Sequence, residues 1–220
     1  MHGTGTTLGG VEGSHSLSDP KRVVADGYDR MGEAFSAWNS ERSPAARRWF
    51  LREVLARLGD GSVVLELGCG PGTDAEELSA GRRYIGIDLS SEQLSIARRH
   101  VPDATFVVGD LTTIGFRPAS FDGVVAFYVF NHVPKDEVRP SFARIFTWLR
   151  PGGWLMSSLL TTEAEDRVEE WLDVPMFFRG RRSSGIRTMA ARGGSNSNSP
   201  TSARKSIPGT GGRTACGSSR

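Results

Sequence analysis

Residues 64–73, VLELGCGPGT, decide how the chain folds. The first four residues read as a short, mostly apolar strand, and three glycines crowd the loop that follows. Glycine has no Cβ, so a loop of this kind lets the backbone approach a ligand closely. The stretch therefore predicts a strand that runs into a ligand-binding loop.

Strands and helices alternate from this stretch onward. We expect strands at 62–67, 83–87, 105–108, 123–130 and 154–160, with helices that end near 79, 100 and 149. Two further helices should precede the sheet, one from Asp19 to about Trp38 and one from Ser43 to about Gly59. Segment 123–130 is almost wholly apolar, which is typical of a strand buried on both faces. The pattern predicts an α/β fold, a doubly wound parallel sheet with helices on both faces.

Charge is distributed unevenly along the 220 residues. The net charge is +2, yet residues 1–173 contain 18 basic and 25 acidic side chains, a net of −7. Residues 179–220 contain nine basic side chains and no acidic one. An acidic body argues against a nucleic-acid-binding face on the folded part.

Composition also excludes several protein classes. The two cysteines, Cys69 and Cys216, form neither a CxxC metal pair nor a disulfide framework. The longest apolar run, 124–130, is far too short for a membrane span, and residues 1–18 contain no apolar signal core. We expect a cytoplasmic protein with a disordered segment 1–18, and with no metal, membrane or nucleic acid partner.

Acidic residues mark the ends of the first three predicted strands, at Glu66, Asp88 and Asp110. Ligands of doubly wound sheets bind at the carboxyl ends of the strands. Asp88 is placed to accept hydrogen bonds from two ribose hydroxyls. The simpler interpretation of Asp88 and Asp110 is that they cap the strand ends.

A dinucleotide is the first ligand to consider, because its fingerprint is GxGxxG with an acidic residue about 20 positions later. Gly68, Gly70 and Asp88 fit this fingerprint, but Thr73 stands at the third glycine position. Glu66 lies two residues before the first glycine, where a carboxylate would repel a pyrophosphate and favour a cation. An NAD-dependent oxidoreductase is therefore disfavoured.

Four motifs, LELGCGPG, YIGIDLS, FVVGDL and LRPGG, carry a family resemblance. In order and spacing they resemble the motifs of class I S-adenosylmethionine-dependent methyltransferases, and the small-molecule members of the methyltransferase type 11 kind look most similar. The resemblance covers roughly residues 20–178. It implies a Rossmann-like fold, S-adenosyl-L-methionine as the cofactor, and in-line transfer of a methyl group to an O, N or C atom of a small molecule.

The resemblance also implies which residues bind the cofactor. The methionine and ribose part would lie against the glycine loop, which comprises Gly68, Cys69, Gly70 and Gly72. Glu66 would help to hold the methionine ammonium through water or backbone. Asp88 would bind the ribose hydroxyls, and Leu89 would pack on the adenine.

The remaining implied contacts involve the adenine edge and the methionine end. Asp110 would accept a hydrogen bond from the adenine amino group, with Leu111 beside it, and the backbone around Phe127 would face the methionine. Tyr28 resembles an aromatic residue that closes over the cofactor, although packing in the core is the alternative for this side chain. We interpret Cys69 as a small packed residue rather than a nucleophile.

Methyl transfer from a sulfonium needs little acid–base catalysis, because the leaving group is a neutral thioether and positioning can supply most of the rate. A base matters only when the acceptor atom must lose a proton. His132, in FNHVP, lies where the acceptor should bind and is the candidate base. The alternative is a structural histidine at a strand end, and Asn131 is a further candidate for orienting the acceptor.

The chain divides into a segment 1–18, a methyltransferase domain 19–178 with its core at 62–160, and a basic low-complexity tail 179–220. The tail lacks apolar periodicity, so we expect it to form no buried strand and the C-terminal strands of the fold to be missing. One interpretation is a natural tail that attracts anionic partners. We favour a reading-frame shift near Phe178, because synonymous codons for 195–202 can encode an alternating strand in another frame. The chain would then be a catalytically impaired, cofactor-binding product of a truncated or frameshifted gene.

Overall fold

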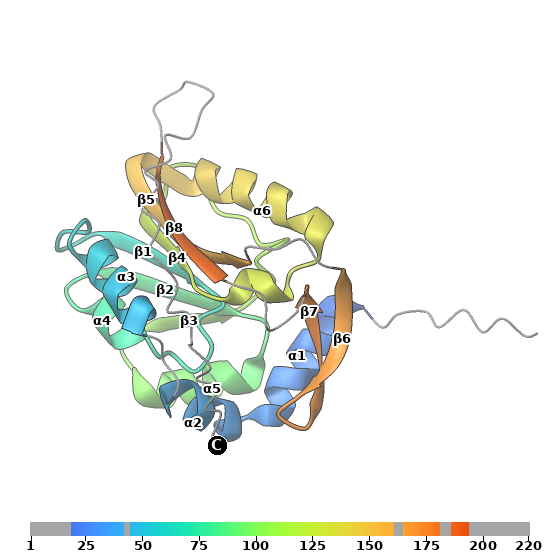
Figure 1. Cartoon of the computed structure of the whole chain (residues 1–220). Helices are drawn as coiled ribbons and strands as arrows, with labels where there is room; N and C mark the ends of the chain where they lie inside the picture. The colour runs from blue at the N-terminus through green and yellow to red at the C-terminus, as the bar shows by residue number, and fades with distance from the viewer. Residues whose placement is uncertain (1–18, 42–44, 161–164, 181–185, 194–220) are drawn as a thin grey trace, which may run out of the picture.

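The computed structural model describes residues 19–41, 45–160, 165–180 and 186–193. A six-stranded sheet lies at its centre, in the order β3-β2-β1-β4-β5-β8 (Figure 1). Its strands are β1 (Val63–Leu67), β2 (Arg83–Asp88), β3 (Thr105–Val108), β4 (Phe121–Ala126), β5 (Leu149–Leu160) and β8 (Ile186–Arg192). The first five strands run parallel. The predicted doubly wound parallel sheet is confirmed.

Helices cover both faces of this sheet. One face packs against α3 (Ala45–Leu55), α4 (Ala75–Ser79) and α5 (Ser91–His100), and the other against α6 (Lys135–Trp148) and the 3-10 helix η1 (Val129–His132). Successive side chains of a strand point to opposite faces, so Val64 joins the first core cluster and Leu65 the second. No helix within the described ranges is long and apolar enough to cross a membrane.

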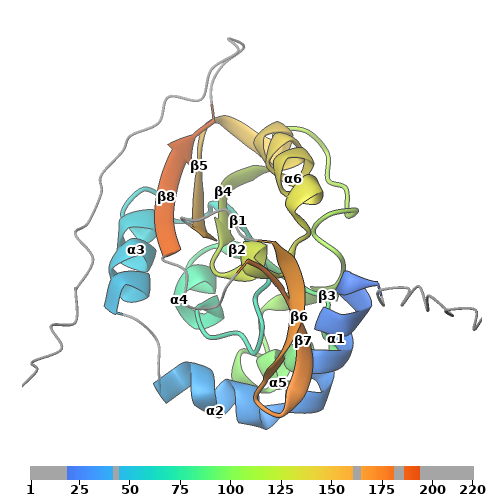
Figure 2. The same ribbon diagram turned by 45° about the vertical axis from the view of Figure 1, so that its right-hand side comes forward.

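A third layer covers the carboxyl ends of the strands. It consists of α1 (Pro20–Met31), α2 (Glu33–Glu41) and the antiparallel hairpin of β6 (Asp166–Trp171) and β7 (Val174–Arg179), and we call it the cap layer. Figures 1 and 2 show α1 beside this hairpin. Gly27 permits the close approach, because a Cβ there would lie 2.6 Å from Cε of Met176.

Three elements end or break earlier than their sequence patterns predict, and one of them is α3, which ends at Leu55 and not near Gly59. The first predicted helix is divided into α1 and α2, because the chain turns at Gly32 with a φ of +46°. The strand predicted at 123–130 ends at Ala126, since Tyr128 adopts a left-handed φ of +61°. The Asn131 N–H then donates to the Tyr128 carbonyl at 3.2 Å and starts η1.

The C-terminal part also differs from the expectation that the last strands are missing. The structure corrects this for Ile186–Arg192, which forms β8 and pairs antiparallel with β5. A strand at the edge of a sheet is held by backbone hydrogen bonds to one neighbour, so it does not need the apolar pattern of a buried strand. Residues 1–18 and 194–220, which include most of the expected tail, lie outside the described residues.

Gly68 is a position in the glycine loop that we expect to tolerate no side chain. Its φ is +68°, and a Cβ there would lie 2.4 Å from Cγ2 of Val129. Gly68→Ala should lower the free energy of unfolding by about 3 kcal/mol, through backbone strain and overpacking. Gly115→Ala is the matched control, since a Cβ at Gly115 meets nothing within 4 Å. Urea denaturation measures both, and an equal loss in the two variants would contradict the prediction.

Candidate functional site

A cavity of about 380 Å³ lies between the cap layer and the carboxyl ends of the strands. The loops that follow β1, β2, β3 and β4 contribute to it, as do α1, α2 and β7. Ten of the predicted site residues line it: Tyr28, Gly68, Cys69, Gly70, Asp88, Leu89, Asp110, Leu111, Phe127 and His132. Residues from segments that are far apart in the sequence, from α1 to η1, therefore line the same cavity.

Asp88 fastens the glycine loop to the end of β2. Its Oδ2 accepts a hydrogen bond from the Gly70 N–H at 2.8 Å, and its Oδ1 accepts one from the Ser90 N–H at 2.9 Å. Burial raises the pKa of Asp88, and these backbone donors oppose the shift. Each carboxylate oxygen has a second lone pair, so Asp88 can still accept hydrogen bonds from a ligand in the cavity.

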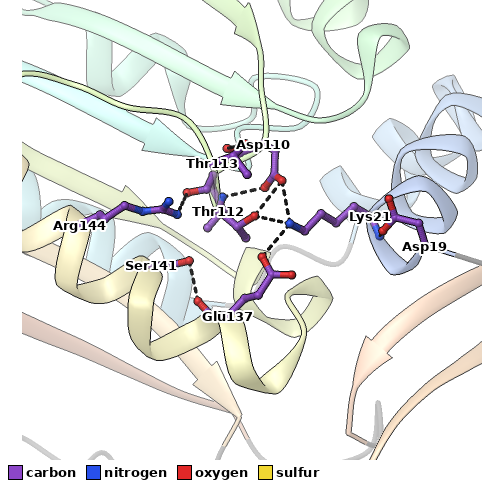
Figure 3. Close-up of polar contacts among 9 residues, drawn as sticks. Asp19, Lys21, Asp110, Thr112, Thr113, Glu137, Ser141 and Arg144 are labelled. Carbon is purple, nitrogen blue, oxygen red and sulfur yellow. Dashed lines mark hydrogen bonds and ion pairs between the residues drawn. The ribbon is translucent and has the colours of Figure 1, made fainter.

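Asp110 lies at the centre of a polar network that joins β3 to the cap layer (Figure 3). It accepts hydrogen bonds from the Thr112 N–H at 2.7 Å and the Thr112 hydroxyl at 2.8 Å, and Lys21 Nζ lies 3.1 Å away. Lys21 also pairs with Glu137 at 2.7 Å. Partial burial opposes ionisation, but the Thr112 and Lys21 contacts hold the pKa of Asp110 below its usual value. Sequence reasoning did not identify Lys21, because its partners come from distant segments.

Glu66 and Gly72 do not line the cavity, unlike the other predicted site residues. The Tyr84 hydroxyl donates to Glu66 at 2.5 Å, and burial, together with the nearby charge of Asp74, raises the pKa of Glu66 to about 8. Gly72 packs against α5, where a Cβ would lie 3.1 Å from Cβ of Ala97. Glu66 thus contacts Tyr84 of β2, and Gly72 is the part of the glycine loop that contacts α5.

Arg47 of α3 is a lining residue that the sequence did not single out. Its Nε and Nη2 both lie 2.9 Å from Oδ2 of Asp74. The guanidinium carbon lies 5.7 Å from the centre of the Phe127 ring and 5.9 Å from that of Tyr128. No local signal distinguishes Arg47, because three arginines occur within α3 and only the fold brings one of them beside Asp74.

Tyr28 and His132 form a hydrogen-bonded pair. Nδ1 of His132 lies 2.7 Å from the Phe177 carbonyl oxygen, which can only accept, so Nδ1 carries the proton. Nε2 therefore accepts from the Tyr28 hydroxyl at 2.9 Å. Burial lowers the pKa of His132 to about 4, so the imidazole is neutral at pH 7.

Aromatic rings surround this pair. Tyr28 contacts Phe35 at a centroid separation of 4.9 Å and Trp171 at 5.9 Å, and His132 contacts Phe178 at 4.8 Å. The cavity thus has a carboxylate-lined end at β2 and β3 and an aromatic end under the cap layer. Such an arrangement can hold a polar nucleoside and an apolar second ligand side by side.

The chain is similar to known methyltransferases. Residues 64–153 match a family model described as a methyltransferase domain. The chain is 29% identical over 144 residues to the demethylmenaquinone methyltransferase of Renibacterium salmoninarum. This match covers 64% of this chain and 60% of the relative. It is 36% identical over 149 residues to the trans-aconitate 2-methyltransferase of Delftia acidovorans. This match covers 63% of this chain and 53% of the relative. The chain therefore spans less than two thirds of the length of these curated relatives.

One solved structure shows the same fold over most of the chain. It is the 1,6-didemethyltoxoflavin-N1-methyltransferase of Burkholderia thailandensis with bound 1,6-didemethyltoxoflavin and S-adenosylhomocysteine. The sequence identity is 22% and the TM-score is 0.60, with 81% of this chain and 92% of that chain covered.

The lowered pKa of His132 predicts a pH dependence of stability. Between about pH 6.5 and pH 4 the unfolded state binds a proton at this histidine that the folded state does not, so stability should fall as the pH decreases. From pH 7 to pH 5 the contribution of His132 to this loss is about 2 kcal/mol.

His132→Gln removes the titrating group, so its free energy of unfolding should fall by about 2 kcal/mol less than that of the wild type over the same interval. Urea denaturation at the two pH values measures the difference. A variant with the same pH dependence as the wild type would show that the folded protein does not shift this pKa.

Proposed function

We propose that the chain is a class I S-adenosylmethionine-dependent methyltransferase, that its cavity binds S-adenosyl-L-methionine and that it methylates a small molecule. The match of residues 64–153 to a methyltransferase domain supports this proposal. One observation carries this proposal. Asp88 and Asp110, at the ends of the neighbouring strands β2 and β3, line the same cavity as the glycine loop. Two carboxylates beside such a loop match the hydroxyl and amino donors of an adenosine.

The nucleoside of the cofactor would lie along the ends of β2 and β3. Asp88 would accept from the two ribose hydroxyls with the lone pairs that Gly70 and Ser90 leave available. Asp110 would accept from the adenine amino group. The adenine would pack between apolar side chains that line the cavity, those of Leu89 and Leu111.

The methionine end of the cofactor would lie against the glycine loop and the backbone of Phe127. Arg47 would donate to the methionine carboxylate, because it is a cation on this part of the cavity wall. Glu66 would act indirectly, through its contact with Tyr84 of β2. The thiol of Cys69 would pack against the cofactor without reacting, since burial raises its pKa and keeps it protonated.

The acceptor would occupy the aromatic end. When bound, S-adenosyl-L-methionine would supply an electrophilic methyl group beside the acceptor, with a neutral thioether as the leaving group. A proton from the acceptor would pass to the Tyr28 oxygen while the Tyr28 proton passes to Nε2 of His132. The Asn131 side-chain oxygen would orient the acceptor, because it is buried without a hydrogen-bond partner in the described part of the chain.

Asp88→Asn tests the cofactor site. Replacing the carboxylate by an amide weakens two charge-assisted hydrogen bonds, so affinity for S-adenosylhomocysteine should fall at least tenfold, or about 1.4 kcal/mol. Calorimetry on the full chain measures this, with NAD as a ligand that should not bind. Asp103→Asn, which changes an exposed acid outside the cavity, should leave the affinity unchanged. A folded Asp88→Asn protein with wild-type affinity would refute the assignment.

His132→Gln tests the proton path separately. Turnover should fall by a factor on the order of a hundred, while the affinity for S-adenosylhomocysteine stays near that of the wild type. Methyl transfer from labelled S-adenosylmethionine into a fractionated metabolite extract supplies the assay. Near-normal turnover would reduce His132 to a structural role.

A further inference from the structure

The cations that line the cavity differ in whether they have a carboxylate partner. Lys21 pairs with Asp110, and Arg47 pairs with Asp74. Arg179 also lines the cavity. Its cross-strand neighbour Asp166 stabilises its charge from a distance, but Arg179 forms no ion pair with any residue that the structure describes. A charge that is partly removed from water without a partner is unfavourable. The cavity therefore contains one cation, Arg179, that no carboxylate of the described residues contacts directly.

Arg179 is held at the aromatic end of the cavity. It is the last residue of β7, and its Nε donates to the Phe130 carbonyl oxygen at 3.2 Å. His132 of η1 donates in the opposite direction to the Phe177 carbonyl, so two hydrogen bonds fasten β7 to η1. The Arg179 guanidinium is thereby anchored to the segment that carries Asn131 and His132. Its two terminal nitrogens make no hydrogen bond to any residue that the structure describes.

We propose that the methyl acceptor is an apolar carboxylic acid whose carboxylate binds the terminal nitrogens of Arg179, an inference that rests on the proposed function. The planar guanidinium presents two parallel N–H donors that match the two oxygens of a carboxylate. Arginine stays charged at neutral pH even where partial burial lowers its pKa, as it does here.

The charges and the aromatic side chains that line the cavity restrict the class of acceptor further. Asp88 and Asp110 line the same cavity, so a doubly charged phosphate would meet more repulsion than a singly charged carboxylate, which one guanidinium neutralises. Tyr28, Trp38 and Trp171 supply a wall of rings that suits an unsaturated or aromatic body.

Matched acids and amides test this proposal. The probes are 4-hydroxybenzoate with 4-hydroxybenzamide, and 6-hydroxy-2-naphthoate with its primary amide, each titrated by calorimetry into the full chain saturated with S-adenosylhomocysteine. At least one acid should bind tenfold or more tightly than its amide. Arg179→Gln should abolish this preference, and Arg179→Lys should retain part of it, because lysine keeps the charge but not the planar fork. Arg117→Gln makes the same charge change at an exposed site outside the cavity and should keep the preference.

Two failures can be told apart. If S-adenosylhomocysteine does not bind the wild-type chain, the proposed function fails and the acid acceptor fails with it. If S-adenosylhomocysteine binds, the acid acceptor is overturned by any of three results: acid and amide bind equally, no probe binds at millimolar concentration, or the preference for the acid survives Arg179→Gln.

Discussion

The half-buried carboxylate of Asp88 connects the parts of the site. Its two oxygens accept from the N–H groups of Gly70 and Ser90, which fixes the glycine loop against the start of α5. The Ser90 hydroxyl donates in turn to Asp29 of α1 at 2.6 Å, and Asp29 also accepts from the Glu92 N–H at 3.0 Å. Removing this carboxylate would leave buried donors without partners, which costs more than the bonds themselves contribute. The shape of the loop and the position of the cap layer thus depend on the same side chain.

The sheet and its loop could be predicted from the sequence, because the signals for them are local. Apolar runs separated by helical segments gave the strands, and the glycines after β1 gave the loop. Asp88 and Asp110 could be placed for a topological reason: the carboxyl ends of parallel strands meet at one edge of the sheet. Strand periodicity could also have located Glu66, since it lies two residues from Val64 and so points to the same core face.

The rest of the site depends on contacts between distant segments. Lys21, Arg47 and Arg179 are ordinary surface-type residues in their local sequence, and only the fold brings them to the cavity. The strand β8 was missed for a different reason, because an edge strand is defined by backbone pairing and not by an apolar pattern. The early end of β4 was missed because a left-handed φ at a tyrosine has no sequence signature, unlike the same conformation at a glycine.

The cap layer has a consequence for how such a protein can diversify. Its segments, 20–41 and 166–179, lie entirely outside the region 64–153 that matches the methyltransferase domain, although both contribute to the cavity. The contribution of the cap layer is therefore encoded outside the matched region, whereas Asn131 and His132, which also line the cavity, are encoded inside it. Mutations in the cap layer can change which molecule fits the aromatic end without altering the glycine loop or the carboxylates after β2 and β3. The cap layer can thus change while the loop after β1 and the carboxylates after β2 and β3 stay the same, as expected of a fold that serves many reactions.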